Sequence, residues 1–280
     1  MIQMLVPAAA CAEMFSDAPE STMFSDEAAV VANAVDQRRR EFGTVRYCAR
    51  KALLQIGIPA VPIVPARDGS PRWPAGVVGS MTHCAGYRAA AVARASELSS
   101  VGIDAEPHAA VPGGVLDVIL RDEERAGLAS LADAYPNLHW DRILFCAKEA
   151  VYKAWFPLAR QWLDFADVST TVNPDGTFGA YVHFRWPRAG AGGEAFSGRW
   201  VVGRGLVVAA TSVDRSPTTE VPTTSSRALR SAHFGSSGLR RPVGPRSSER
   251  HEPTAAALVS GIWGSSRSAP LAHRERQPGL

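Results

Sequence analysis

The sequence is poor in cysteine. Cys11, Cys48, Cys84 and Cys146 are the four cysteines in 280 residues, and no two of them form a Cys-x-x-Cys pair. Cys48 and Cys146 lie inside apolar patterns with helical spacing, where a free thiol packs as a small apolar side chain. The pattern favours buried free thiols in a reducing cytoplasm over the alternative of disulfide bonds.

Long apolar runs and several common motifs are also missing. No run of 18 apolar residues occurs, so no membrane span is expected. Residues 1–12 are apolar but lack a positively charged start, which makes a poor signal peptide. The chain has no Gly-x-x-x-x-Gly-Lys-[Ser/Thr] loop and no Gly-x-Ser-x-Gly elbow. These absences argue against an ordinary P-loop kinase and against a serine hydrolase.

Charge is unevenly distributed along the chain. The net charge is +3, but residues 215–280 contain ten Arg, no Lys and four Glu, a local balance of +6. Residues 1–214 therefore carry about −3, the difference between those two values. The basic character comes from the tail, so it does not by itself indicate nucleic-acid binding.

The N-terminal part predicts one long helix. Ser25 or Asp26 is a suitable N-cap, and Gly57 followed by Pro59 is a stop signal. Gly43 is expected to break or bend this helix midway. Apolar residues recur between these limits at spacings of three, four or seven: Val31, Val35, Phe42, Val45, Ala49, Ala52 and Ile56.

The rest of the body mixes strand and helix patterns. Strands are predicted at 77–83, 89–92, 100–104, 178–186, 199–202 and 206–211. Helices are predicted at 115–132 and, as a strongly amphipathic helix, at 140–155. From Pro217 onward Ser, Thr, Pro, Gly and Arg dominate, and such a segment buries too little apolar surface to order itself. The expected fold class is α/β (α+β), with a body at 1–214 and a disordered tail at 215–280.

Two carboxylates end the third predicted strand. Residues 101–107 read Val-Gly-Ile-Asp-Ala-Glu-Pro, so Asp104 and Glu106 point to the same side of an extended backbone. Two neighbouring oxygen ligands suit Mg²⁺, which completes its shell with phosphate and water. Pro107 is expected to stop the strand. The alternative is a solvated strand end with two unrelated acids.

Further charged residues lie on the amphipathic helix. Glu149 and Lys153 are four residues apart, opposite the apolar stripe, with Lys148 and Tyr152 alongside. Glu149 is a candidate for completing a metal site or for taking a proton from a hydroxyl nucleophile, and a neighbouring lysine for holding a phosphate. An ordinary surface salt bridge is the alternative.

Candidate phosphate-binding groups occur earlier in the chain. Segment 73–84 ends a strand with Thr82 and His83, where backbone N–H groups and an imidazole could meet a phosphate oxygen. The first helix carries Arg39, Arg46 and Arg50 on one face. A structural histidine, a solvated basic face and RNA contact are the alternatives, although few aromatic residues accompany the arginines. Together, three carboxylates and several cations indicate phosphoryl transfer from a phosphate-rich donor.

Four segments, in this order, resemble the 4′-phosphopantetheinyl transferases. They are residues 46–52, 73–84, 102–107 (Gly-Ile-Asp-Ala-Glu-Pro) and 147–154 (Ala-Lys-Glu-Ala-Val-Tyr-Lys-Ala). The resemblance runs from about residue 14 to 213 and is closest to the enterobactin-synthetase-component-D branch, especially its actinobacterial enzymes. It implies a pseudo-twofold fold of two similar halves, about 1–102 and 103–214, with coenzyme A and Mg²⁺ (or Mn²⁺) in the cleft between them.

The resemblance also implies an activity and a set of site residues. The chain would transfer the 4′-phosphopantetheine group of coenzyme A to a serine of apo acyl or peptidyl carrier proteins of fatty acid, polyketide or nonribosomal peptide synthases, releasing 3′,5′-ADP. It would act as a cytoplasmic monomer without nucleic acid or membrane. The implied catalytic residues are Glu149, as base, with Asp104 and Glu106. The implied metal ligands are Asp104, Glu106, Glu149 and the Ala105 backbone. The implied coenzyme A contacts are Arg38, Arg46, Arg67, Thr82, His83, Asp104, Glu149 and Lys153.

One segment departs from the family pattern. Relatives often carry lysines in the loop before the Trp-Pro pair, whereas here loop 64–70 has Arg67 as its single cation. Two alternative functions also remain: another Mg²⁺-dependent transferase that uses a nucleotide donor, and an Arg-rich nucleic-acid-binding protein that uses the tail.

Overall fold

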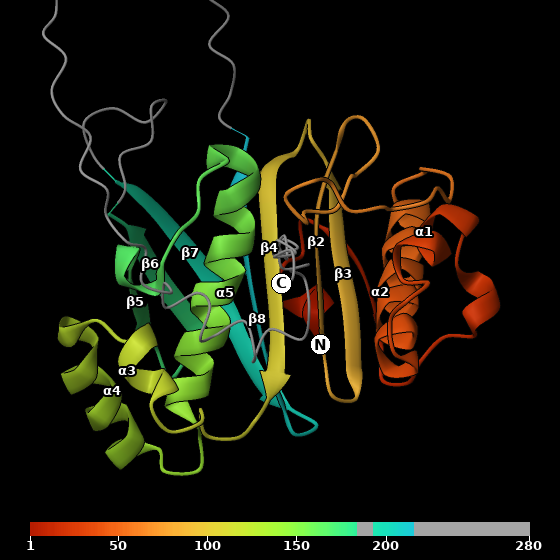
Figure 1. Cartoon of the computed structure of the whole chain (residues 1–280). Helices are drawn as coiled ribbons and strands as arrows, with labels where there is room; N and C mark the ends of the chain where they lie inside the picture. The colour runs from red at the N-terminus through yellow and green to blue at the C-terminus, as the bar shows by residue number, and fades with distance from the viewer. Residues whose placement is uncertain (184–192, 216–280) are drawn as a thin grey trace, which may run out of the picture.

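The computed structural model describes residues 1–183 and 193–215. Its strands form two antiparallel sheets, with the orders β1-β3-β2 and β4-β8-β7-β6-β5. The sheets lie edge to edge with β2 beside β4, and each has one long helix, α2 or α5, against it (Figure 1). With η for a short 3₁₀ helix, the elements are η1 (Ile2–Met4), β1 (Ala10–Met14), η2 (Glu20–Thr22), α1 (Ser25–Val30), α2 (Asp36–Gln55), β2 (Val77–Cys84), β3 (Tyr87–Arg94), β4 (Leu98–Pro107), α3 (Val115–Ile119), α4 (Asp122–Ala134), α5 (Trp140–Ala159), η3 (Phe165–Asp167), β5 (Val168–Val172), β6 (Thr177–Val182), β7 (Glu194–Gly203) and β8 (Leu206–Asp214).

Helix α5 packs its apolar side on the five-stranded sheet. The stripe read from the sequence is buried in this contact: Trp140, Ile143, Leu144, Ala147, Val151 and Trp155. Each large apolar side chain buried in this way contributes about 1.5–3 kcal/mol. The amphipathic helix is therefore confirmed, and its packing holds the opposite side of α5 in a fixed orientation.

Strand β4 and helix α5 approach each other closely at Gly102. A Cβ added there would lie 1.9 Å from the Ala150 carbonyl oxygen and 2.7 Å from the Ala154 nitrogen. The Ser100 hydroxyl also donates a hydrogen bond to the Ala154 carbonyl oxygen (2.7 Å). Only glycine fits this contact, which brings residues on this face of β4 next to α5.

The single long helix predicted near the N-terminus is wrong. Helix α1 ends at Val30, and α2 begins at Asp36. Val35, assigned to the apolar stripe, is 74% exposed in the linker between them. Helix α2 runs unbroken through Gly43, where an added Cβ would lie 2.9 Å from the Met23 side chain. Gly43 therefore serves close packing and does not bend the helix.

The predicted N-caps of the first helix are also wrong. The residue before α1 is Phe24, so Ser25 and Asp26 lie inside the first turn. The Phe24 N–H donates to Glu27 Oε2 (3.1 Å), so the Glu27 side chain, three residues into the helix, accepts the hydrogen bond of the backbone N–H that precedes α1.

The predicted strands agree with the structure in place but not in length. All six correspond to strands, and β4 continues through Pro107, which is its last residue. The part of the strand predicted at 178–186 that follows His183 lies outside the described residues. Strands β1 and β5 were missed, although β5 alternates buried and more exposed residues. The helix predicted at 115–132 is two helices, because Leu120 is extended and Glu124 caps the backbone N–H of Arg121 (2.8 Å).

The mixed helix-and-sheet class is confirmed. A boundary near residue 102 would cut β4, whose pairing with β8 is continuous from Ser100 to Pro107, so the division into halves stays a prediction. The predicted disorder of the tail lies outside the described residues, apart from Arg215. Within the described ranges, no helix is long and apolar enough to cross a membrane.

Candidate active site

Three acidic side chains come together between β4 and α5. Asp104 and Glu106 lie on the same face of β4 as Gly102, where α5 packs. The intervening Ala105 points the other way, into a core that β3, β4, β8 and the N-terminal segment share. Glu149 comes from the middle of α5. The prediction that the two strand carboxylates share one side is confirmed.

Asp104 has one oxygen held by the protein and one oxygen free. The side chain is only 4% exposed. Its Oδ1 accepts hydrogen bonds from Thr82 Oγ1 (3.1 Å) and Lys153 Nζ (2.7 Å). Its Oδ2 is buried and has no hydrogen-bond partner among the described residues. A buried oxygen without a partner is costly, so this atom is suited to a ligand that the chain itself does not supply.

The other two carboxyls are perturbed by burial and by their neighbours. Burial raises the pKa of Glu149 well above 4.5, and the charge of Asp104 raises it further, whereas Lys153 opposes the shift. Burial and Asp104 raise the pKa of Glu106 to about 8, against the opposing effect of Arg142 and Lys153. For Lys153 itself, burial lowers the pKa, but Asp104 and Glu149 outweigh it and leave the pKa above its ordinary value. Such clustered shifts are typical of sites that handle protons or bind a cation.

Arg142 forms an ion pair with Glu106. Its Nη1 lies 3.2 Å from Glu106 Oε2, and its Nε and Nη2 donate to the carbonyl oxygens of Ala109 and Ala110 (3.0 and 3.1 Å). Arg142 was not predicted as a site residue. Its position seven residues before Glu149, on the same helix face, is the signal that could have found it.

A second group of polar side chains surrounds the end of β2. Arg38 Nη1 and His83 Nε2 are 2.9 Å apart. Burial, followed by the charges of Arg38, Lys153 and Arg88, lowers the pKa of His83 to about 4. The ring is therefore neutral at neutral pH and accepts the Arg38 proton at Nε2. Arg88, which was not predicted, lies opposite His83 in the β2–β3 hairpin, whose register is set by a short turn with Gly86 at a φ of 75°.

The alternative of a solvated basic face on the first helix is wrong for Arg46 and Arg50, because both side chains are buried. Arg46 is 7% exposed; its Nε donates to the Ile63 carbonyl oxygen (2.7 Å), and its guanidinium lies over the Phe42 ring. Burial lowers the pKa of Arg46 to about 9. Arg50 is paired with the buried carboxylate of Glu27 (2.6 Å). Arg46 connects α2 to the segment at Ile63, and Arg50 connects α2 to α1 at Glu27. Contact of Arg46 with coenzyme A stays a prediction.

Arg67 is a surface residue of loop 64–70. It is exposed, and the structure gives it no hydrogen bond or ion pair to another described residue. Its neighbour Asp68 contacts Arg160, the residue after α5 (3.3 Å). Loop 64–70 is therefore connected to the helix that carries Glu149 and Lys153.

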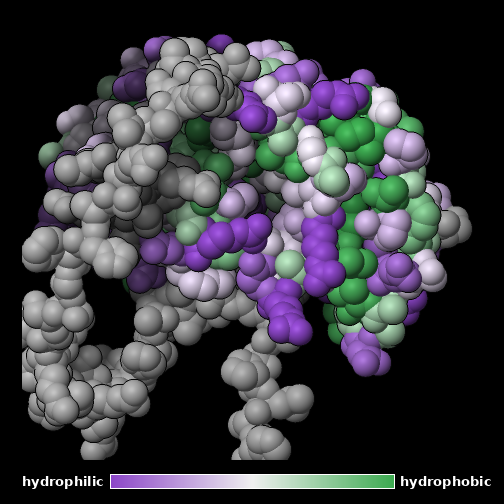
Figure 2. Space-filling model, turned by 90° about the horizontal axis from the view of Figure 1, so that it is seen from above, coloured by the Kyte–Doolittle hydropathy of each residue, from purple (hydrophilic) through white to green (hydrophobic). Residues whose placement is uncertain are grey.

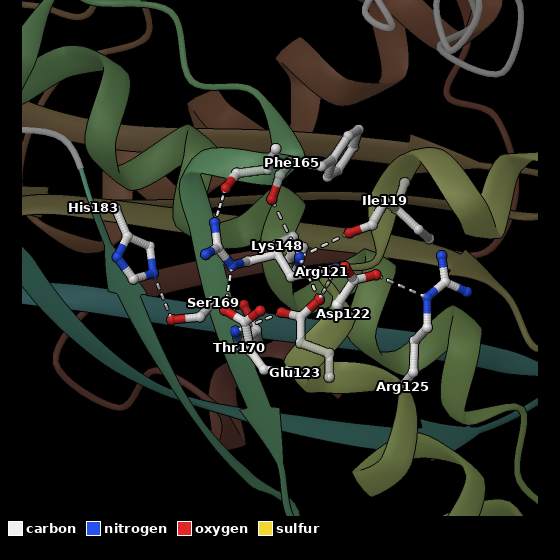
Figure 3. Close-up of polar contacts among 12 residues, drawn as sticks. Ile119, Arg121, Asp122, Glu123, Arg125, Lys148, Phe165, Ser169, Thr170 and His183 are labelled. Carbon is white, nitrogen blue, oxygen red and sulfur yellow. Dashed lines mark hydrogen bonds and ion pairs between the residues drawn. The ribbon is translucent and has the colours of Figure 1, made fainter.

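Lys148 is buried away from the acidic cluster. Its ammonium donates to the Ile119 and Phe165 carbonyl oxygens (2.8 and 3.3 Å) and to Glu124 Oε2 (2.8 Å). Figure 3 shows the side chain reaching between these segments, next to Thr170. Lys148 is therefore not available to a phosphate. The surface Glu149–Lys153 salt bridge, considered as an alternative, is also wrong, because Lys153 pairs with Asp104.

The residues fit a divalent cation that receives further ligands from a substrate. Among the residues described, no group of three His, Cys, Asp or Glu side chains is arranged to hold a metal ion by itself. Mg²⁺ usually takes one or two protein carboxylates together with substrate phosphates and waters. Asp104, through its free Oδ2, and the buried carboxyl of Glu149 meet this need. Direct contact of Glu106 or the Ala105 backbone with the metal stays a prediction.

One face of the molecule carries both polar and apolar side chains. Seen from above, hydrophilic side chains gather near the middle of the visible surface, and hydrophobic side chains gather on the side where α1 and α2 lie (Figure 2). A polar centre suits a charged ligand better than an apolar one.

Comparison with known proteins identifies the family. Residues 26–93 match the 4′-phosphopantetheinyl transferase N-terminal domain, and residues 100–207 match the 4′-phosphopantetheinyl transferase superfamily. The chain is 51% identical over 219 residues to the 4′-phosphopantetheinyl transferase Svp of Streptomyces mobaraensis, covering 76% of this chain and 89% of that protein. It is 50% identical over 211 residues to the 4′-phosphopantetheinyl transferase PptT of Mycobacterium tuberculosis, covering 72% and 90%.

A more distant relative lies on the branch named in the sequence analysis. Enterobactin synthase component D of Salmonella typhi is 32% identical over 123 residues, which cover 42% of this chain and 49% of that protein. Nothing in these matches supports the nucleic-acid-binding alternative. With half its aligned positions shared with two such enzymes over most of their length, this chain is a transferase that belongs to the 4′-phosphopantetheinyl transferase superfamily.

Proposed function

We propose that this chain transfers 4′-phosphopantetheine from coenzyme A to a serine hydroxyl of apo acyl or peptidyl carrier proteins, with Mg²⁺ as the cofactor. The observation that carries the proposal is the acidic cluster of Asp104, Glu106 and Glu149, in which one buried Asp104 oxygen has no partner. The polar group around Arg38 and His83 lies close to this cluster. Beyond the effect of burial, the pKa of His83 is lowered by the charge of Lys153 and raised by that of Asp104, because these side chains are near the ring.

The chemistry assigned to the chain is a phosphoryl transfer. The serine oxygen forms a bond to the phosphorus that carries the pantetheine arm, and the bond from that phosphorus to the bridging oxygen breaks. The products are the phosphopantetheinylated serine and 3′,5′-ADP. Most of the catalytic effect in such a reaction comes from positioning and charge stabilisation.

Glu149 is proposed as the base for the serine proton. In the absence of a cation, burial and Asp104 raise its pKa, and a bound cation would favour the carboxylate form, which is the form that accepts a proton. Lys153 has its positive charge strengthened by Asp104 and Glu149, and it is proposed to orient a phosphate oxygen. Arg38 and His83 are proposed to contact the phosphates or adenosine at the nucleotide end, with Arg46 and Arg67 as further candidates.

Asp104 and Glu149, with Glu106 beside them, would hold the Mg²⁺ ion. The ion would neutralise charge on the pyrophosphate oxygens and on the leaving group. Mn²⁺ is an alternative ion with similar ligands. The monomeric state, the cytoplasmic location and the absence of membrane and nucleic-acid partners stay predictions.

The test is intact-mass spectrometry of an apo acyl carrier protein after incubation with this chain, coenzyme A and Mg²⁺. We expect a mass gain that matches one phosphopantetheine group, and loss of that gain in excess chelator. A carrier protein whose target serine is replaced by alanine is the control for site. No mass gain with several apo carrier proteins, from a folded enzyme that binds coenzyme A, would contradict the proposal.

A further inference from the structure

The two sheets are joined by side-chain hydroxyls. Strand β4 pairs with β8 on one edge, and its other edge faces β2. On that side, the Ile103 N–H donates to Ser80 Oγ and the Ala105 N–H donates to Thr82 Oγ1, both at 3.1 Å. Both hydroxyl side chains are 4% exposed. They therefore satisfy backbone donors that would otherwise be buried without partners.

Thr82 has a second contact that Ser80 lacks. Its hydroxyl donates to Asp104 Oδ1 (3.1 Å), and Lys153 Nζ donates to the same oxygen (2.7 Å). Asp104 Oδ2 receives no hydrogen bond from the described residues. Thr82 and Lys153 thus both bind Oδ1 of Asp104, and Oδ2 is the oxygen left without a partner among the described residues.

The hydroxyl of Thr82 has a single proton, which limits the further hydrogen bonds that it can donate. A threonine hydroxyl has one proton to donate and two lone pairs to accept with. In this structure the proton goes to Asp104 and one lone pair accepts the Ala105 N–H. No donor remains for a phosphate oxygen, which also has no proton of its own to give at neutral pH. The expected contact between Thr82 and coenzyme A is therefore disfavoured.

We propose that Thr82 is a positioning residue for Asp104: together with Lys153 it holds Oδ1 and so directs Oδ2 toward the divalent cation. This inference rests on the proposed function, since it needs a cation at Asp104. Groups that orient a metal ligand typically change metal affinity or activity by about 10- to 100-fold when removed.

Ser80 supplies a matched control. Thr82→Val and Ser80→Ala each remove one hydroxyl from the contact between β2 and β4, but only Thr82→Val removes a contact to Asp104. Thr82→Ser keeps the hydroxyl and should restore the contact. All three variants are compared with the wild-type chain for thermal unfolding, so that a general loss of structure is measured separately.

The first readout is binding of Mn²⁺ alone, followed by electron paramagnetic resonance. We expect Thr82→Val to weaken Mn²⁺ binding by about 10-fold or more, with Ser80→Ala and Thr82→Ser close to the wild type. The second readout is coenzyme A binding by calorimetry in excess chelator. Here we expect Thr82→Val to stay within about twofold of the wild type, because its hydroxyl has no donor for a phosphate.

Three results would overturn the inference. The first is coenzyme A binding without metal that weakens strongly in Thr82→Val, which would make Thr82 a direct phosphate ligand. The second is equal loss of Mn²⁺ affinity in Thr82→Val and Ser80→Ala. The third is no Mn²⁺ binding by the wild type. Failure of the proposed function is distinguishable, since it would appear as no carrier-protein modification while the difference in Mn²⁺ affinity persists.

Discussion

At the residue scale, Glu149 combines deep burial with like-charged neighbours. It is 4% exposed on α5, and Asp104 and Glu106 both raise its pKa in addition to the effect of burial. In the absence of a cation, its charged form is disfavoured by lost hydration and by repulsion. A bound cation would reverse this preference, so the same carboxyl can serve as a ligand or as a base once the site is filled.

Replacing Glu149 with glutamine should slow turnover without preventing coenzyme A binding. An amide accepts no proton from serine, so we expect kcat to fall by about 10²- to 10⁴-fold, with coenzyme A affinity changed by only a few-fold. Steady-state rates and calorimetry check the two parts. If only the Michaelis constant for coenzyme A rises, Glu149 is a binding residue and the assignment as base is wrong.

The pH dependence of stability gives an independent check on the same variant. The folded pKa of Glu149 lies above 4.5, so the folded state binds more protons than the unfolded state once the pH exceeds that value. Without metal, the wild type should lose stability relative to Glu149→Gln as the pH rises above about 4.5, and the difference should vanish at lower pH. Denaturant unfolding of both proteins in chelator at pH 4 and pH 7 measures this.

At the scale of elements, the site depends on how closely α5 lies against β4. Gly102 leaves no room for a side chain, since Ala150 and Ala154 backbone atoms occupy the space. Asp104 is two residues further along the same face, and Glu149 precedes Ala150 in the helix. Any separation of α5 from β4 would therefore also separate the carboxylates.

Gly102→Ala should be strongly destabilising for this reason. The added methyl would overlap helix backbone, and overpacking of this kind costs about 1–3 kcal/mol or more. We expect a lower free energy of unfolding in urea and reduced transfer activity at temperatures where the protein is still folded.

Gly127→Ala is the matched control for this substitution. Gly127 is exposed in α4, and an added Cβ there would meet no atom within 4 Å. Alanine in an exposed helix position should stabilise by about 0.5–1 kcal/mol. Equal effects of the two substitutions would mean that the contact between β4 and α5 adjusts easily, against the rigidity inferred from Gly102.

At the scale of the whole molecule, the proposed site residues all lie in the first 160 positions. The last described strand, β8, ends at Asp214 and pairs with both β4 and β7. Residues 217–280 contribute no periodic apolar pattern that could extend these sheets. They are rich in arginine, and salt screens any long-range attraction that these charges exert on acidic partners.

Deleting residues 217–280 should leave transfer activity nearly unchanged. We expect the truncated and full-length chains to have similar kcat and similar Michaelis constants for a carrier protein, measured at low and high ionic strength. Loss of activity at low salt alone would indicate electrostatic steering by the tail, because salt screens it. A large loss at both salt concentrations would show that the tail packs on the catalytic body, contrary to our domain boundary.

Local sequence patterns predicted helix α5, six of the strands and much of the acidic cluster. The periodicity of α5 and the alternation at Asp104 and Glu106 arise from backbone geometry, which repeats every 3.6 or 2 residues whatever surrounds it. The same helical period places Glu149 on the side of α5 opposite the apolar stripe. Predictions of this kind need only the residues that are close along the chain.

Only the tertiary structure decided which polar side chains are buried and with what partners. Arg46, Arg50 and Lys148 read as exposed charges, yet each is buried against groups from a distant segment. Thr82 is a predicted coenzyme A contact, and the approach of β2 to β4 places its hydroxyl within hydrogen-bond distance of Asp104 and of the Ala105 N–H, which the sequence did not show. The physical reason is that desolvation and hydrogen bonding depend on which surfaces meet, and that is set by packing between segments far apart in sequence.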